Sequence, residues 1–350
     1  MIIGSCGFGG TGSSVLTDLL SEYDNIQIYD KFEFVLPYRI DGLQDLEYHL
    51  LKQYAKFESG DYAIKRFLEQ SKCYMTPLIN KPCNGKIFYN LSKQFINSII
   101  QIEYKGSDTA DLLSGNILKN ILAFGSKKVL MPKIIEKLTK KPSYLWPCRK
   151  MYYSIDPSNF YEEASKYIKN ILIAMGADLN KPICLDQPFE GNNPMQSFKF
   201  FDDPYAIVID RDPRDLYLDA IYNKSPDGKF YPRTNVKDFV IYYRNMRKNK
   251  KDTDRVIYLN FESFIYDYDN TVNRIEKFLN LGKHLRRQEV FDPNKSINNT
   301  QMIRLHPDKM EDIKYIENEL SDYLFPFEKY PKPEFNGTPF SGSARNVTKF

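Results

Sequence analysis

A glycine-rich loop near the start of the chain restricts the fold more than any other segment. Its residues are Gly7-Phe8-Gly9-Gly10-Thr11-Gly12-Ser13-Ser14. The loop follows an apolar run (residues 1–6) and precedes an amphipathic pattern (residues 13–22) and an alternating one (residues 25–29). Glycines let the backbone approach a phosphate, and a helix N-terminus offers unpaired N–H groups. The segment therefore predicts the opening of a parallel βαβ unit with an anion site.

The loop matches two phosphate-binding patterns. Residues 7–12 satisfy G-x-G-x-x-G, and Asp30 ends the next strand, where a dinucleotide-binding fold places its ribose-binding acid. Residues 7–14 also satisfy a P-loop pattern with Ser13 in place of its lysine. A nucleoside triphosphatase needs that lysine on the β- and γ-phosphates, so the sequence disfavours ATP or GTP hydrolysis.

A second motif lies far along the chain, over residues 207–217. An apolar strand ends at Asp210-Arg211, and Asp212-Pro213-Arg214-Asp215 then opens a helix. An arginine at the carboxyl end of a strand projects into the crevice where open α/β sheets bind ligands. Its planar fork suits a phosphate monoester.

The two motifs together resemble those of the sulfotransferase superfamily that uses 3′-phosphoadenosine-5′-phosphosulfate (PAPS). The resemblance covers roughly residues 1–40 and 180–300, with weaker matches at residues 256–263 and at residues 291–299, which would close over the nucleotide. It implies PAPS as the sulfo donor, PAP as the product and no metal. It assigns these cofactor-binding residues: Gly9, Gly10, Thr11, Gly12, Ser13, Ser14, Arg211 and Arg214.

Two positions depart from the family pattern. The family usually has Lys or Arg where this chain has Gly10, so Lys31, Arg39 or Arg149 is expected to supply the cation. Many relatives have a serine eight residues after the motif arginine, where this chain has Asp219. A carboxylate would repel a phosphate, so we expect Asp219 to pair with a neighbouring cation or to point away.

Sulfo transfer also needs a base for the acceptor hydroxyl. The family uses a histidine or a glutamate, and none of the three histidines occupies the family position. Glu33 lies in a segment (residues 29–37) that resembles the one supplying the base in glutamate-type members. We predict Glu33 as the base, with Asp186 and Asp30 as alternatives because each follows a strand at the same edge of the sheet.

The order of the motifs predicts a P-loop NTPase-like α/β fold, with about five parallel strands flanked by helices and a large helical insertion. The predicted PAPS-binding core comprises residues 1–44 and 181–325, and an extended tail covers residues 326–350. The insertion, residues 45–180, includes helical patterns over residues 90–104 and 111–122 and is expected to form the acceptor pocket.

Composition restricts the acceptor and the setting. Phe and Tyr are abundant (24 and 26) beside one Trp, which slightly favours a lipophilic alcohol such as a sterol over a glycan or capsular sugar, with a peptide tyrosine third. A net charge of 49 − 45 = +4 gives no argument for nucleic acid, and no apolar run reaches the ~18 to 20 residues of a membrane span. Five scattered cysteines without a CxxC pair predict a cytoplasmic protein without a disulfide framework or a zinc site. A bacterial source is what the resemblance to sulfotransferases implies.

Two other functions remain open from the sequence. A Rossmann-type NAD-dependent oxidoreductase would use the glycine loop and Asp30 but not Arg211. A non-catalytic PAP- or anion-binding protein of the same fold would account for Gly10 in place of a cation.

Overall fold

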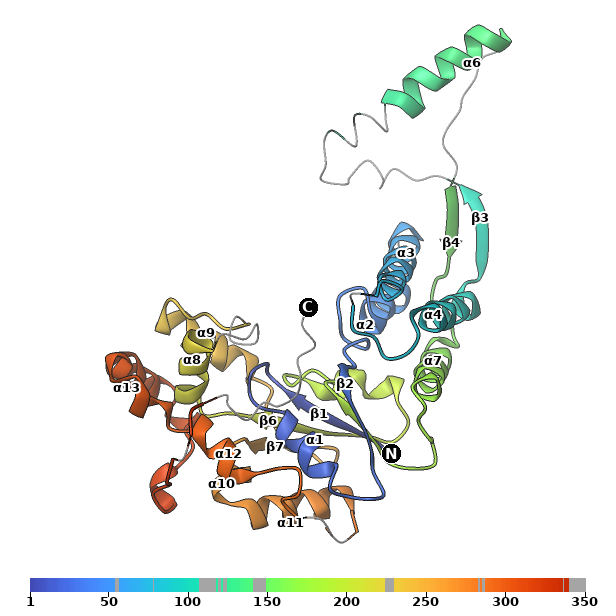
Figure 1. Ribbon diagram of the computed structural model, residues 1–350. Helices are drawn as coiled ribbons and strands as arrows, with labels where there is room; N and C mark the ends of the chain where they lie inside the picture. Colours follow the sequence, from blue (N-terminus) through green and yellow to red (C-terminus); the bar gives the residue numbers. More distant parts are fainter. Residues whose placement is uncertain are drawn as a thin grey trace. The chain divides into compact units, whose positions relative to one another are not determined.

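A sheet of five parallel strands forms the centre of the nucleotide-binding half predicted above (Figure 1). The strands are β1 (Ile2–Gly7), β2 (Gln27–Glu33), β5 (Ile183–Asp186), β6 (Pro204–Asp210) and β7 (Val256–Asn260). They lie in the order β2-β5-β1-β6-β7, and every neighbouring pair is parallel. β1 is central and buried from Ile2 to Cys6, which explains why the strand is apolar apart from Ser5. The predicted α/β fold with about five parallel strands is confirmed.

The computed structural model describes residues 1–53, 57–77, 79–106, 118, 121, 125–140, 149–223, 230–282, 284, 287–335 and 337–339. The chain divides into two compact units. The first comprises residues 1–38, 77–84 and 168–350, and the second comprises residues 39–76 and 85–167. The sheet and both sequence motifs belong to the first unit.

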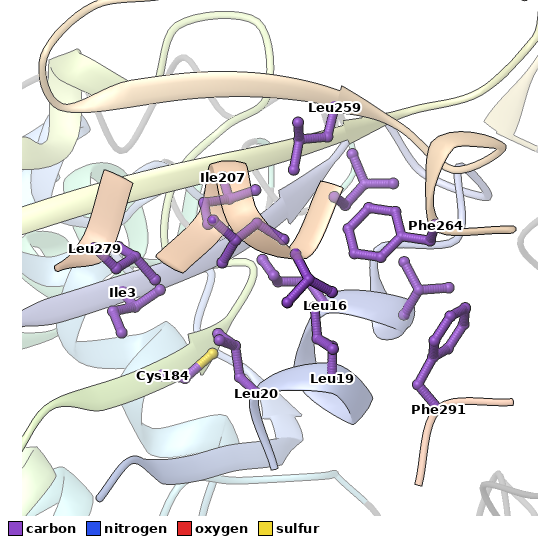
Figure 2. Close-up of a cluster of buried hydrophobic side chains, with 14 of the residues drawn as sticks. Ile3, Leu16, Leu19, Leu20, Cys184, Ile207, Leu259, Phe264, Leu279 and Phe291 are labelled. Carbon is purple, nitrogen blue, oxygen red and sulfur yellow. The ribbon is translucent and has the colours of Figure 1, made fainter. Parts of the chain in front are cut away.

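The helices of the first unit pack against the sheet or against one another, and two clusters of buried apolar side chains hold them. These helices are α1 (Ser14–Leu20), α8 (Pro213–Tyr222), α9 (Val236–Met246), α10 (Ser263–Tyr266), α11 (Tyr268–Leu279), α12 (Pro293–Ser296) and α13 (Met310–Glu319). Figure 2 shows the core in which Leu16 and Leu19 of α1 meet Ile3, Ile207 and sheet neighbours. Full burial of one such side chain contributes roughly 1.5–3 kcal/mol, so this cluster fixes α1, and with it the glycine loop, against the sheet.

The insertion follows the second strand, as predicted. It contains α2 (Leu43–Glu47), a π-helical turn (Tyr48–Lys52), α3 (Phe57–Cys73), α4 (Gly85–Ile99), a second π-helical segment (Gly125–Leu130), α6 (Met131–Thr139) and α7 (Phe160–Ala174), which ends in the first unit. Rings of Phe67, Phe95 and Tyr167 pack together in its core.

The insertion is not wholly helical. β3 (Ile102–Gly106) and β4 (Arg149–Tyr153) form a two-stranded antiparallel ribbon. The helix predicted over residues 90–104 is therefore wrong beyond Ile99, because Ile102 and Tyr104 pair with β4 across a separation that no local pattern reveals. The helix predicted over residues 111–122 lies outside the described residues, apart from positions 118 and 121.

The predicted tail, which belongs to the first unit, starts with a short 3₁₀ turn, Phe327–Lys329. Phe327 and Tyr330 both contact the ring of Tyr266. Residues 340–350 of the predicted tail lie outside the described residues. No described helix combines the length and the apolar character that crossing a bilayer requires.

Candidate functional site

The glycine loop connects β1 to α1 at the carboxyl end of the central strand. Gly9, Gly10 and Gly12 have φ of 83°, 64° and 80°, in the region that side-chain-bearing residues rarely adopt. A Cβ added to Gly12 would lie 2.7 Å from Phe261 Cδ2, so the loop also needs glycine there for space. Within the described residues, the N–H groups of these three glycines donate to no protein acceptor.

Neighbouring side chains hold the loop in this shape. Gly7 N donates to Gln187 Oε1 (3.1 Å), and Gln187 Nε2 donates to Ser13 Oγ (2.8 Å). The Tyr231 hydroxyl donates to the carbonyls of Phe8 and Gly9, each at 2.7 Å. Both ends of the loop are therefore fixed from segments more than 170 positions away, which preorganises the free amides toward a ligand.

The loop opens onto a cleft of about 740 Å³ within the first unit. Of the eight predicted cofactor-binding residues, six line this cleft: Gly9, Gly10, Gly12, Ser13, Ser14 and Arg211. The segment after residue 290, expected to close over a nucleotide, contributes Phe291, Asp292, Lys295, Ser296 and Asn299. The structure thus brings both motifs and the carboxy-terminal segment to one cavity.

Thr11 and Arg214 are the two predicted cofactor-binding residues outside the lining. Thr11 is buried, and its hydroxyl accepts from Phe8 N (3.2 Å), so it stabilises the loop internally. Arg214 Nη2 donates to Asp212 Oδ2 (2.7 Å), and Nη1 donates to Glu317 (3.0 Å). The helix start that places Pro213 also turns Arg214 toward α13 and away from the cleft.

Arg211 reaches the loop from the end of β6. Its Nη1 donates to Gly10 O (3.2 Å), and its Nη2 donates to Asn299 O (2.8 Å), so one guanidinium joins the glycine loop to the carboxy-terminal segment. Nη1 also lies 3.3 Å from Asp219 Oδ2. Asp219 therefore pairs with a neighbouring cation, as its chemistry suggested, and that cation is the motif arginine itself.

Several carboxylates also line the cleft. Glu33 and Asp186, the predicted catalytic residues, both belong to the lining, whereas Asp30 does not. Sequence reasoning missed Glu190, which also lines the cleft and is half-buried. Burial raises the pKa of the Glu190 carboxyl. Its position in the sequence could have indicated it, because Glu190 lies four residues after Asp186 in the segment that follows β5.

Lys31, Arg39 and Arg149 are the three cations expected to replace the basic residue that the family has at the position of Gly10. Lys31 is exposed and absent from the lining, and Arg39 and Arg149 belong to the second unit. There Arg39 donates to Tyr74, and Arg149 donates to Tyr62. Lys295 lines the cleft, with its Nζ 3.6 Å from Asp292 Oδ2 and a side chain 73% exposed.

A buried acidic network positions the carboxy-terminal segment. Asp215 accepts from the backbone N–H groups of Gln301 (2.8 Å) and Met302 (2.7 Å). Burial and the nearby Asp212 raise the pKa of Asp215 to about 6. Glu262 accepts from Asp212 N (3.0 Å), and burial raises the pKa of its carboxyl well above the usual range. The second motif thus shapes the cleft through its acids as well as through Arg211.

No group of three or more His, Cys, Asp or Glu side chains that could hold a metal is found among the described residues. The charged and polar groups of the cleft include the backbone amides of the glycine loop, Arg211, Lys295 and six carboxylates, which are Asp18, Glu33, Asp186, Glu190, Asp219 and Asp292. Backbone amides and cations of this kind suit an anionic ligand, and a carboxylate can act as a base.

Two sulfotransferase domains among solved structures are similar to the chain. One, from the olefin synthase of Synechococcus PCC 7002, is 12% identical with a TM-score of 0.37, and the match covers 86% of each chain. The other, from the curacin biosynthetic pathway, is 11% identical with a TM-score of 0.37, and the match covers 93% of this chain and 98% of that domain. No family model and no curated protein matches the chain. The parallel sheet with a glycine loop after its central strand is consistent with the P-loop-like sulfotransferase fold that the motifs indicate.

Proposed function

We propose that the chain is a sulfotransferase that moves the sulfo group of PAPS to an acceptor hydroxyl and releases PAP. The observation that carries the proposal is the convergence in one cleft of the glycine loop, Arg211 and the carboxylates Glu33 and Asp186. The loop is separated from Arg211 by about 200 positions, so only the fold brings an amide cradle and an arginine to the same anion.

The residues of the cleft fit the donor at its 5′ end. The amides of Gly9, Gly10 and Gly12, which have no protein acceptor among the described residues, would hold the 5′-phosphate. Arg211 keeps a buried Nε that has no hydrogen-bond partner among the described residues, and this nitrogen would meet a further anionic group. PAPS supplies the transferable sulfo group when bound.

The chain contributes a base and cations to the reaction. Glu33 would take the proton of the acceptor hydroxyl, and Asp186 beside it is the alternative. Lys295 would neutralise negative charge on the leaving phosphate, replacing the cation that the family keeps at the position of Gly10. Positioning and electrostatics account for the rate, as in phosphoryl transfer.

The order of the strands argues against an NAD-dependent oxidoreductase. In a Rossmann fold the second strand lies beside the first, so that its terminal acid reaches the ribose. Here β5 lies between β1 and β2, and Asp30 is not among the residues that line the cleft. A non-catalytic PAP-binding protein is favoured only by Gly10 and by the Arg211–Asp219 ion pair.

We further propose a lipophilic alcohol as acceptor, with a glycan nearly as well supported, and a cytoplasmic setting in a bacterium. The insertion would supply the acceptor pocket. Support comes from apolar side chains that its described part exposes, among them Ile87 (47%), Ile102 (54%) and Tyr104 (40%). Transfer of labelled sulfate from PAPS to a sterol, a sugar and a tyrosyl peptide in parallel would identify the class.

A thermal-shift panel with PAP, PAPS, NAD and ATP tests the proposed function. A ligand at 100 times its dissociation constant stabilises the folded state by about 2.7 kcal/mol, which is readily measured. We expect shifts with PAP and PAPS and none with NAD. The absence of a PAP shift would contradict the proposal, and PAP binding without sulfo transfer to any acceptor would indicate the non-catalytic alternative.

A further inference from the structure

Both terminal nitrogens of Arg211 already form hydrogen bonds or an ion pair within the protein. Nη1 lies 3.3 Å from Asp219 Oδ2 and donates to Gly10 O, while Nη2 donates to Asn299 O. The Arg211 and Asp219 side chains are only 5% and 3% exposed. A ligand anion that reaches this arginine therefore meets a guanidinium whose charge is already balanced by a buried carboxylate.

Asp219 is held in this position from its own helix. Asn223, four residues later at the end of α8, donates from Nδ2 to Asp219 Oδ1 (3.0 Å), while Oδ2 faces Arg211. Both residues belong to the lining of the cleft. A rotation of the Asp219 side chain away from Arg211 would break both interactions, so the carboxylate is a fixed part of the anion site.

We propose that Asp219 determines donor specificity by lowering the affinity of the cleft for the 3′-phosphate of the nucleotide. The inference rests on the proposed function and concerns the same site. A phosphate bound at Arg211 would share the guanidinium with a fixed carboxylate, and like charges a few ångströms apart in a buried site repel strongly. A 3′-hydroxyl can instead donate a hydrogen bond to that carboxylate. With Asp219 present, the affinities of the cleft for nucleotides with and without a 3′-phosphate should therefore differ less than they would if Arg211 had no carboxylate beside it.

Calorimetric titration with PAP and with AMP, which lacks the 3′-phosphate, tests the proposal on the full chain. Asp219→Asn keeps the shape of the side chain and removes its charge. It should bind PAP at least tenfold more tightly, or ~1.4 kcal/mol, and AMP within about twofold of the unsubstituted protein. Asp219→Glu keeps the charge and should keep the original preference. Asp203→Asn, which removes a carboxylate that pairs with Arg255 and does not line the cleft, should leave the ratio of PAP to AMP affinity unchanged.

Asp219→Asn leaves a buried arginine without its carboxylate, so the variant can lose stability. Thermal denaturation with each nucleotide keeps the test decisive. PAP should raise the melting temperature of Asp219→Asn more than that of the unsubstituted protein, because it replaces the lost anion and binds more tightly, whereas AMP should raise both by similar amounts. An unchanged PAP-to-AMP preference in Asp219→Asn, with PAP still binding, would overturn this inference alone. Failure of every variant and of the unsubstituted protein to bind PAP would overturn the proposed function as well.

Discussion

Glu33 and Asp186 are register partners at the carboxyl ends of the neighbouring parallel strands β2 and β5. The register shifts between Tyr29, which pairs with Leu185, and Glu33, which pairs with Asp186. Without that shift, the next pair after Tyr29 and Leu185 would be Asp30 with Asp186. The irregular end of β2 therefore selects Glu33 over Asp30 as the carboxylate beside Asp186, and both Glu33 and Asp186 line the cleft.

The first prediction concerns the base. Glu33→Gln should lower turnover by ~10² to 10⁴, because the side chain keeps its size and loses its basicity. PAP affinity should stay nearly unchanged, and the limb of the pH–rate profile that reports the base should disappear. Sulfo-transfer kinetics combined with PAP titration would measure both quantities.

Asp186→Asn is the matched control, since Asp186 occupies the partner position in the register. Unchanged turnover in Glu33→Gln together with loss in Asp186→Asn would transfer the role to Asp186. Full activity in both variants would contradict a carboxylate base from this pair.

The second prediction concerns Arg211. Arg211→Ala should weaken PAP binding by about 2–5 kcal/mol, because a charge-assisted contact disappears and Asp219 remains in the cleft unpaired by Arg211. Adenosine 5′-phosphosulfate, which lacks the 3′-phosphate, should lose much less affinity. Calorimetric titration of both nucleotides checks the difference. An equal loss for both would show that Arg211 does not recognise the 3′-phosphate.

The third prediction tests the conformation of the loop. Gly12→Ala should destabilise the fold by about 1–3 kcal/mol and weaken PAP binding, because Gly12 has a φ of 80° and its Cβ would lie 2.7 Å from Phe261. Urea denaturation measures the change. Gly282→Ala is the matched control, since a Cβ at Gly282 meets no atom of the described residues within 4 Å and its φ lies outside the left-handed region. Equal effects of the two substitutions would contradict the argument.

The fourth prediction concerns acid stability and Asp210. Burial raises the pKa of Asp210, but Arg247 (Nη2 at 2.6 Å) and Lys250 (Nζ at 2.9 Å) outweigh it and hold the pKa at about 2. A carboxyl whose folded pKa lies below its ordinary value of 3.8 stabilises the fold above that value. This contribution, about 2 kcal/mol at neutral pH, should be lost as pH falls from about 4 toward 2.

Urea denaturation at pH 7, 4 and 3 would follow that loss. Asp210→Asn should be strongly destabilised at pH 7, because it leaves the buried Arg247 without its carboxylate, and the difference from the unsubstituted protein should narrow in acid. Asp203→Asn is the control: its ion pair with Arg255 is 48% exposed on the Asp203 side and should contribute less than about 1 kcal/mol. A pH-independent difference for Asp210→Asn would contradict the assigned role.

Much of the core was predictable because local patterns carry it. Adjacent residues in the sequence were enough to predict the strands β1, β6 and β7 from their apolar runs. The same holds for the glycines of the loop and for the arginine after β6. The insertion was less predictable. Ile102 and Tyr104 continue a helical pattern but form β3, because they pair with β4. Their partners lie about 50 residues later in the chain, so no local pattern reveals the pairing.

The sequence by itself determined that a glycine loop and an arginine would meet at the carboxyl edge of a parallel sheet, since glycine, proline and alternating apolar residues act on the backbone locally. Only the tertiary structure decided which side chains share the cleft. In the folded chain Arg211 pairs with Asp219, and Arg214 pairs with Glu317. Lys295 lines the cleft, and Glu33 lies beside Asp186 in the register of β2 and β5. The reason is that ion pairing, burial and register depend on distances between residues far apart in the chain, which composition and spacing do not specify.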